Sequence, residues 1–339
     1  MRYAEIQLAL PDAFFMKQNH LIARAKQLLD AGELVAIPTE TVYGLAADAT
    51  NLEAVDKIYK VKGRPSNNPV ILHFASLEAA TPYILDITEE AQKLAAAFWP
   101  GPLTLLLPKS AKVPDRITAG LPRVAIRVPN NELTLTLLGQ LSYPLAAPSA
   151  NPSGYISPTT AEHVTRQLGH KVSLVLDGGP CDQGLESTIF GWDGEGRPTV
   201  YRKGTITEEA IAQVLHSIPR THTTKTIEAP GMLSSHYAPH TRTLITEDLV
   251  ATIEEHKDTN FGVIALDSKM ETKGLNHLIV LSIGGHLPEA ASNLYSAMHQ
   301  MDTKGLDLII IEKAPDFGIG KAINDRILRA TGGIKKKAP

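Results

Sequence analysis

The sequence predicts an α/β protein with two domains, the first built on a mixed β-sheet and the second on a smaller parallel sheet. The chain of 339 residues is long for one domain and comfortable for two. Strand-like and helix-like segments alternate in the first two thirds without a strict βαβ order, which favours a mixed sheet. A stretch rich in Thr, Ser and Pro then interrupts the apolar periodicity. We therefore expect a first domain at 1–216, a linker at 217–240 and a second domain at 241–339.

Apolar periodicity and capping residues predict the elements of the first domain. Residues 17–31 have the period of an amphipathic helix, which Gly32 ends. A short strand follows at 34–37, and Asn51 is suited to cap a helix that runs to about Lys60. Further strands are expected at 70–74, 103–107, 123–128, 145–147, 173–176, 187–190 and 198–202, and further helices from 77 and at 88–98, 131–141 and 159–168.

The second domain has a more regular rhythm. Helices expected near 247–256, 286–301 and 320–330 alternate with strands expected at 242–246, 261–266, 278–282 and 307–311. This cadence is typical of a small parallel α/β unit. Its glycines, at 284, 285, 318 and 320, lack the spacing of a dinucleotide-binding motif, so they do not indicate a nucleotide site.

Composition and charge exclude several classes of protein. The 33 Lys and Arg residues are outnumbered by 36 Asp and Glu residues, which argues against nucleic-acid binding by a generally basic surface. The single cysteine, Cys181, permits no internal disulfide and suits a reducing compartment, and we interpret it as structural. No apolar run approaches the roughly 20 residues of a membrane span. The N-terminus is a poor signal peptide, so we expect a cytoplasmic protein.

The first candidate for chemistry is the pair Lys62 and Arg64. Pro65 and Pro69 follow, so we expect the pair on a stiffened loop rather than a helix. On an extended segment, side chains two residues apart point the same way, and both cations could then reach one polyanion. The alternative is an ordinary surface turn.

The second candidate is the loop around Ser149 and Asn151. It is dense in Ser, Asn, Pro and Gly, and Ser153, Gly154 and Ser157 belong to it. Neutral donors of this kind can cradle phosphate oxygens or a ribose. No GxxxxGK[ST] motif is present, so it is not a Walker A loop. Loops of this composition are, however, often only turns.

Other catalytic patterns fail on inspection. His236 and His240 are four residues apart, but Pro239 disfavours the helix that would align them on a metal. The chain has no CxxC, HExxH or GxSxG motif. We therefore predict no resident metal site and no covalent nucleophile.

Taken together, the segments resemble the YrdC-type threonylcarbamoyl-AMP synthase family in its two-domain form. The matching words occur in family order and include the signature KxR…SxN, which falls on Lys62, Arg64, Ser149 and Asn151. The words are PTETVYGL (38–45), KGRP with NPVILH (62–73), WPGPLTLLL (99–107), VAIRVP (124–129), APSAN with SG (147–154), ESTI (186–189), YRKG (201–204) and PGM with HYAP (230–239).

The resemblance implies a fold and a reaction. The fold would be a YrdC-like mixed twisted sheet with helices, followed by a Rossmann-like C-terminal domain that we interpret as a docking or regulatory module. L-threonine, bicarbonate and ATP would give threonylcarbamoyl-adenylate and pyrophosphate, with Mg²⁺ taking part. Partner transferase proteins would then move the threonylcarbamoyl group to tRNA, and direct RNA contact would be weak.

The resemblance also implies roles for individual residues. The four signature residues would be catalytic, and His236 and Tyr237 would belong to a lid formed by the linker. Threonine would be bound by Thr41, His73, Arg127, Ala147 and Ser187. ATP would be bound by Arg64, Asn68, Ser149, Asn151, Ser157, Arg202, His236 and Tyr237.

Three other functions remain as alternatives. A protein of this fold could bind double-stranded RNA or the ribosome. It could form a carbamoyl-adenylate, as the hydrogenase-maturation branch does, although that branch's acylphosphatase and zinc-finger modules are not visible here. A non-catalytic paralogue is disfavoured because all four signature residues are present.

Overall fold

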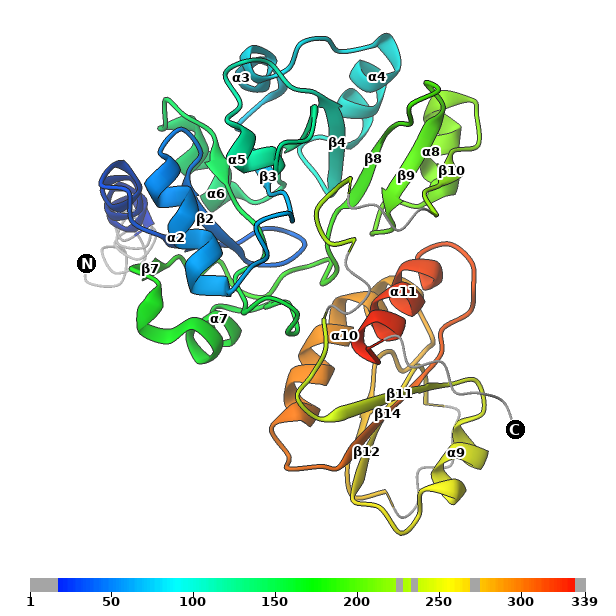
Figure 1. Ribbon diagram of the computed structural model, residues 1–339. Helices are drawn as coiled ribbons and strands as arrows, with labels where there is room; N and C mark the ends of the chain where they lie inside the picture. Colours follow the sequence, from blue (N-terminus) through cyan, green and yellow to red (C-terminus); the bar gives the residue numbers. More distant parts are fainter. Residues whose placement is uncertain (1–17, 224–227, 233–236, 269–274, 333–339) are drawn as a thin grey trace, which may run out of the picture.

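A computed structural model describes residues 18–223, 228–232, 237–268 and 275–332. Two sheets organise them, one in the upper and one in the lower part of Figure 1. The larger sheet has ten strands in the order β10-β9-β8-β4-β5-β3-β6-β2-β1-β7 within the described residues. Their bounds are β1 Val35–Ile37, β2 Gly44–Asp48, β3 Ile71–His73, β4 Leu103–Pro108, β5 Arg123–Arg127, β6 Leu145–Ala146, β7 Leu174–Val175, β8 Thr188–Trp192, β9 Pro198–Arg202 and β10 Arg220–Thr221.

The larger sheet is mixed, as the sequence predicts. The pairs β1·β2, β2·β6, β3·β6, β4·β5 and β8·β9 are antiparallel. The pairs β1·β7, β3·β5, β4·β8 and β9·β10 are parallel. The prediction of a mixed sheet is therefore confirmed.

Helices cover this sheet and close its core. A helix at 18–30 comes first, and Ala54, Val55 and Ile58 of α2 are buried in the central apolar cluster. No helix in the described part of the chain combines the length and the apolar character needed to cross a bilayer. The helices are α2 Leu52–Lys62, α3 Leu77–Ala80, α4 Glu89–Phe98, α5 Asp115–Thr118, α6 Glu132–Gly139, α7 Ala161–Leu168 and α8 Glu208–Leu215, with short 3₁₀ turns η1 Thr81–Tyr83 and η2 Gly169–Lys171.

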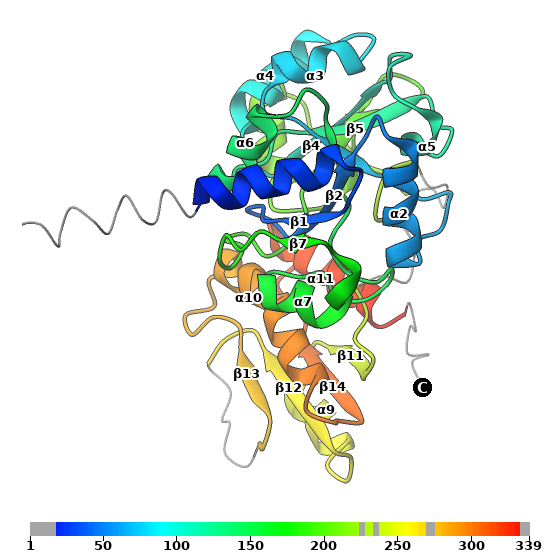
Figure 2. The same cartoon turned by 90° about the vertical axis from the view of Figure 1, so that its left-hand side faces the viewer.

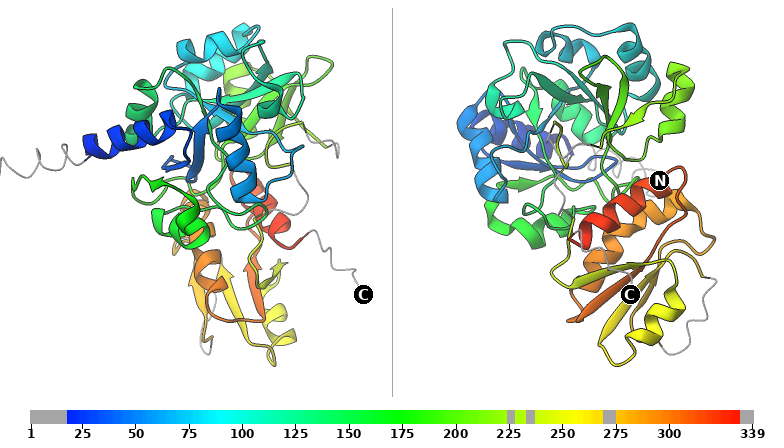
Figure 3. Two further views of the ribbon diagram at one scale, coloured as in Figure 1. Left: turned by 60° about the vertical axis from the view of Figure 1, so that its left-hand side comes forward. Right: turned by 45° about the vertical axis from the view of Figure 1, so that its right-hand side comes forward.

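The smaller sheet is wholly parallel, which confirms the second prediction. Its order is β11-β14-β12-β13, from strands Arg242–Thr246 (β11), Phe261–Ala265 (β12), Leu278–Val280 (β13) and Leu308–Glu312 (β14). The accompanying helices are α9 Leu249–Glu255, α10 Leu287–Asp302 and α11 Gly320–Ala330. Figures 2 and 3 place α10 and α11 at the junction with the larger sheet.

The two parts share an apolar interface. Val42, Ile156 and Leu185 of the larger part belong to one buried cluster with Leu294 and Met298 of α10. Because this cluster is continuous across the junction, the C-terminal part packs directly against the segments that surround the ends of β1 and β8.

Two strands of the larger sheet were not expected. Strand β2 was not predicted, since its sequence GLAAD has no β-branched or aromatic residue, and its pairing with β1 and β6 determines its conformation. Strand β10 falls within the expected linker, yet it pairs with β9 and extends the larger sheet.

The expected loop at Lys62 is a helix end. Asn51 caps α2 by accepting hydrogen bonds from the amides of Glu53 and Ala54, as predicted. The helix continues to Lys62, and Gly63 ends it in the left-handed region at φ 61°. The prediction that Lys62 lies in an extended segment is therefore wrong. Pro65 and Pro69 lie beyond Gly63, where the helix ends, so they do not prevent Lys62 from being helical.

Candidate active site

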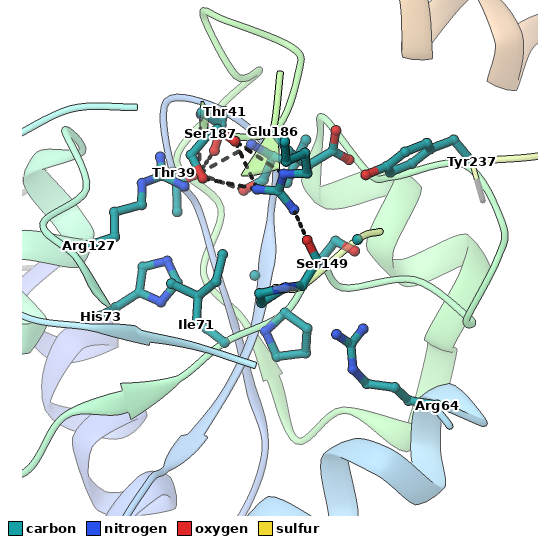
Figure 4. Close-up of a pocket in the computed structure, with 17 residues that line it drawn as sticks. Thr39, Thr41, Arg64, Ile71, His73, Arg127, Ser149, Glu186, Ser187 and Tyr237 are labelled. Carbon is teal, nitrogen blue, oxygen red and sulfur yellow. Dashed lines mark hydrogen bonds between the residues drawn. The ribbon is translucent and has the colours of Figure 1, made fainter. Parts of the chain in front are cut away.

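A polar cavity opens where the ends of several strands of the larger sheet meet. It encloses about 550 Å³, including space open to solvent, and Figure 4 shows the side chains around it. Its wall combines the loop between β1 and β2, strand ends and a few residues of the predicted linker. The lining residues are Thr39, Thr41, Val42, Gly44, Arg64, Ile71, His73, Arg127, Ala147, Pro148, Ser149, Glu186, Ser187, Arg202, Pro230, Gly231 and Tyr237.

Arg64 brings an uncompensated positive charge to this wall. Its Nε donates to the carbonyl oxygen of Asn68 at 3.0 Å, and its Nη2 donates to Asn68 Oδ1 at 2.7 Å and to the carbonyl oxygen of Pro69 at 2.5 Å. All of these acceptors are neutral. Burial lowers the pKa of Arg64 to about 10, so it stays charged at neutral pH. A buried cation held only by neutral oxygens favours an anionic ligand.

Lys62 lies behind the wall rather than on it. Its Nζ donates to the carbonyl oxygens of Ser149 and Asn151, each at 2.5 Å, and lies 3.2 Å from Asn151 Oδ1. The amide of Ser153 in turn donates to the carbonyl oxygen of Lys62 at 2.7 Å. Burial, and then the charge of Arg64, hold the pKa of Lys62 well below its usual range. The two signature motifs are thus in direct contact, but of the two cations expected to reach one polyanion only Arg64 lines the cavity.

Arg127 and His73 form a second charged corner. Arg127 Nη2 lies 2.8 Å from Glu40 Oε2 in a buried ion pair whose angles do not make a hydrogen bond. His73 Nδ1 is buried and has no hydrogen-bond partner in the described structure. Burial, and then the charge of Arg127, lower the pKa of His73 to about 3. A neutral imidazole with an unused nitrogen can bind a hydroxyl or amine of a ligand.

Ser187 and Arg202 form a further part of the cavity wall. Arg202 Nη2 donates to the carbonyl oxygen of Ser187 at 2.9 Å and to its Oγ at 3.0 Å, and Thr104 Oγ1 lies 2.7 Å from the same Oγ. Arg202 Nη1 donates to the carbonyl oxygen of Pro230 at 3.3 Å. Arg202 therefore connects the strand ends of the sheet to the predicted linker.

The chain is similar to known proteins over almost its whole length. A family model described as telomere recombination matches residues 27–204, and one described as threonylcarbamoyl-AMP synthase, C-terminal domain, matches residues 206–332. The threonylcarbamoyl-AMP synthases of Bacillus subtilis and Pyrococcus abyssi are each 40% identical to it, over 92% and 89% of this chain and 93% and 91% of theirs. The chain belongs to the threonylcarbamoyl-AMP synthase family.

A solved structure supports the same relationship. The crystal structure of P. abyssi Sua5 complexed with L-threonine has a TM-score of 0.84 and 38% identity, covering 92% of this chain and 94% of that one. The resemblance expected from the sequence motifs is confirmed by these matches.

Of the residues expected to bind ligands in this family, most line the cavity. Those expected to bind threonine and found in the lining are Thr41, His73, Arg127, Ala147 and Ser187, and those expected to bind ATP are Arg64, Ser149, Arg202 and Tyr237. Asn68, Asn151 and Ser157 are buried behind the wall, where each binds another side chain of the site. His236 lies outside the described residues.

Sequence reasoning missed two carboxylates. Glu40 pairs with Arg127, and Glu186 lines the cavity beside Ser187. Both lie inside words quoted for the family, PTETVYGL and ESTI, so the signal was present without a reason to select them. Cys181 is buried and its pKa is raised to about 12, chiefly by burial, which leaves no thiolate nucleophile at this position.

Proposed function

We propose that this chain is a threonylcarbamoyl-AMP synthase, which makes threonylcarbamoyl-adenylate, pyrophosphate and water from L-threonine, bicarbonate and ATP. The observation that carries the proposal is the convergence of Arg64, Arg127 and Arg202 on one polar cavity. Of these three arginines, only Arg127 forms an ion pair with another described residue. Such a cavity suits substrates that are all anionic or zwitterionic.

The geometry supports a division of the cavity between the two larger substrates. Arg64, Ser149, Arg202 and Tyr237 would contact the nucleotide, and the buried donors behind them would keep the loop at 149–151 in place. His73 and Arg127 would bind the hydroxyl and the carboxylate of threonine, beside Thr41, Ala147 and Ser187. Discrimination against valine would follow, because a buried imidazole nitrogen would be left without a partner.

The chemistry requires no covalent intermediate with the protein. The threonine amine takes up the carbon of bicarbonate and gives a carbamate, whose carboxylate oxygen attacks the α-phosphorus of ATP while the bond to pyrophosphate breaks. Both reactants are negatively charged, so holding them together is the main task. Fixed guanidinium groups neutralise the charge that develops on the phosphoryl oxygens. Lys62 would act by clamping the Ser149–Asn151 loop.

Water must be kept away from the carbamate and the mixed anhydride, since both hydrolyse readily. Pro230, Gly231 and Tyr237 of the predicted linker line the cavity, and Tyr237 is almost fully buried. This placement supports the lid role expected for the linker. We also propose that the first domain ends at residue 216 and that the linker ends at residue 240.

Mg²⁺ enters the proposal as part of the MgATP substrate. The described residues include no group of three or more His, Cys, Asp or Glu side chains that could hold an ion, and Glu186 is already paired with an arginine. Mg²⁺ bound largely through substrate phosphates fits that inventory. We further propose that partner transferases use the product and that contact with RNA is weak. A cytoplasmic location is also proposed, which suits the free thiol of Cys181.

The RNA-binding alternative has less support. The net charge is −3, and the basic side chains Lys62, Arg64 and Arg202 are buried around a cavity rather than spread over a surface.

The test is incubation with ATP, Mg²⁺, bicarbonate and threonine, with pyrophosphate release and a threonine-dependent adenylate as readouts. The Arg64→Ala variant should lose at least about 100-fold in turnover, the scale of one transition-state charge contact. Lys60→Ala, which removes an exposed cation from the same helix end, is the matched control and should be unaffected. Product formed with another amine but not with threonine would overturn the substrate; a fully active Arg64→Ala protein would overturn the site.

A further inference from the structure

An arginine of the C-terminal part reaches the back of the cavity wall. Arg326 of α11 has no exposed side-chain surface, and its Nε donates to Glu186 Oε2 at 2.7 Å. Its Nη2 donates to the carbonyl oxygen of Lys203 at 2.7 Å. Glu186 directly precedes Ser187, and Lys203 directly follows Arg202. One guanidinium therefore joins the ends of the two neighbouring strands that carry cavity residues.

The Glu186 carboxylate is held from both parts of the molecule. Tyr295 of α10 donates to its two oxygens at 2.9 and 3.2 Å, and Ser157 donates to Oε1 at 2.6 Å. Burial alone would raise the pKa of Glu186, but the charges of Arg326 and Arg202 outweigh it and lower the pKa to about 2. The carboxylate is thus an ionised anchor, with its oxygens committed to protein donors.

The same arginine also contacts the predicted lid. Its guanidinium carbon lies 5.0 Å from the ring centroid of Tyr237, and the Tyr295 ring centroid lies 5.7 Å from that of Tyr237. Tyr237 has a φ of 65°, a conformation that a non-glycine residue keeps only when its surroundings hold it. Arg326 and Tyr295 supply part of those surroundings.

We propose that Arg326, together with Tyr295, is a positioning residue for the reaction, through which the C-terminal domain completes the catalytic site. Neither side chain lines the cavity. Both act through Glu186 and Tyr237, and Arg326 also acts through the backbone of Lys203, so that Ser187 and Arg202 keep the geometry required for turnover. The inference rests on the proposed function and assigns the C-terminal domain a part in it.

A second contact between the two parts provides the control. Lys321, also on α11, pairs with Glu208 and Glu209 of α8 at 3.1 and 2.9 Å. Its side chain is 27% exposed, and none of these three residues lines the cavity. Lys321→Gln removes a charge contact across the same junction without touching Glu186 or Tyr237.

The experiment compares kcat, the KM for ATP, the KM for threonine and the circular dichroism of the full chain in four variants. Three are the single substitutions Arg326→Lys, Tyr295→Phe and Lys321→Gln. The fourth is a double variant that combines Arg326→Met with Glu186→Gln. Arg326→Lys keeps the charge but cannot span both strand ends, and the double variant removes both charges together. We expect a folded protein in each case, with kcat lowered on the order of 10- to 100-fold for the two Arg326 variants because reactive groups are misplaced. Tyr295→Phe should lower kcat several-fold, and Lys321→Gln should behave as wild type.

The outcomes separate the two proposals. Absence of threonine-dependent adenylate formation by the wild type would refute the proposed function itself. An active wild type with wild-type kcat and KM in a folded Arg326 variant would overturn the positioning role alone. If both Arg326 variants fail to fold, Tyr295→Phe decides: a lower kcat with unchanged circular dichroism supports the role, and an unchanged kcat overturns it. Equal losses in Lys321→Gln would reduce Arg326 to a general junction contact and would also overturn it.

Discussion

Replacing Arg127 with methionine is expected to destabilise the larger part of the molecule by about 3–5 kcal/mol, the cost of stranding a buried charge. The structure defines the perturbation. Arg127 and Glu40 side chains are 4% and 5% exposed, and Nη2 lies 2.8 Å from Oε2. Neither carboxylate oxygen of Glu40 has a hydrogen-bond partner in the described structure. Without Arg127, therefore, the carboxylate keeps its desolvation cost and loses the charge that offsets it.

The double variant Arg127→Met with Glu40→Leu separates this effect from ordinary packing. Replacing a whole buried pair by apolar side chains is often neutral or stabilising, so most of the lost stability should return. Activity should not return, because Arg127 also lines the cavity. Urea unfolding followed by tryptophan fluorescence is the assay, since both tryptophans, Trp99 and Trp192, lie in the larger part.

The reasoning would be refuted by a single variant that loses no more than about 1 kcal/mol, the range of an exposed ion pair. A double variant no more stable than the single one would equally contradict it, because the loss would then come from the missing arginine side chain rather than from an unpaired carboxylate.

Three further predictions concern the scaffold. Asn51→Ala removes the cap of α2 and should cost roughly 1 kcal/mol in urea unfolding, whereas a loss near zero would show that the cap is dispensable. Gly204→Ala would place a Cβ 2.4 Å from the amide nitrogen of Thr188, so it should cost roughly 1–3 kcal/mol and reduce turnover. Gly139→Ala, in a helix with open space around it, is its control and should be neutral or stabilising. Acidification below pH 6.5 should destabilise the fold through His73, His163 and His299, whose pKa values burial lowers to about 3 to 4. In this range the unfolded chain binds protons that the native state excludes, so each of these histidines should cost up to roughly 1 kcal/mol for each pH unit. A free energy of unfolding that does not change with pH in this range would disprove the assignment of the effect to these histidines.

Much of the site could be predicted because its signals are local. Asn51 as a cap, the alternation of strands and helices, and the Lys-x-Arg and Ser-x-Asn motifs, each taken singly, depend on residues close together in the chain. Family resemblance then supplied the substrate and the residues around it. The direction of Lys62 could not be predicted, since it depends on the left-handed Gly63 and on carbonyl oxygens 87 and 89 residues away.

The sequence by itself determined most of the element order, the two sheet types and the set of polar residues available for an anion site, because periodicity, capping and composition are properties of neighbouring residues. Only the tertiary structure decided which charges are compensated. Arg127 meets Glu40, and Arg326 meets Glu186, which lies 140 residues away in the chain, while Arg64 meets only neutral oxygens. The physical reason is that the free energy of a buried charge depends on the groups that the fold brings within a few ångströms of it, and spacing along the chain does not contain that information.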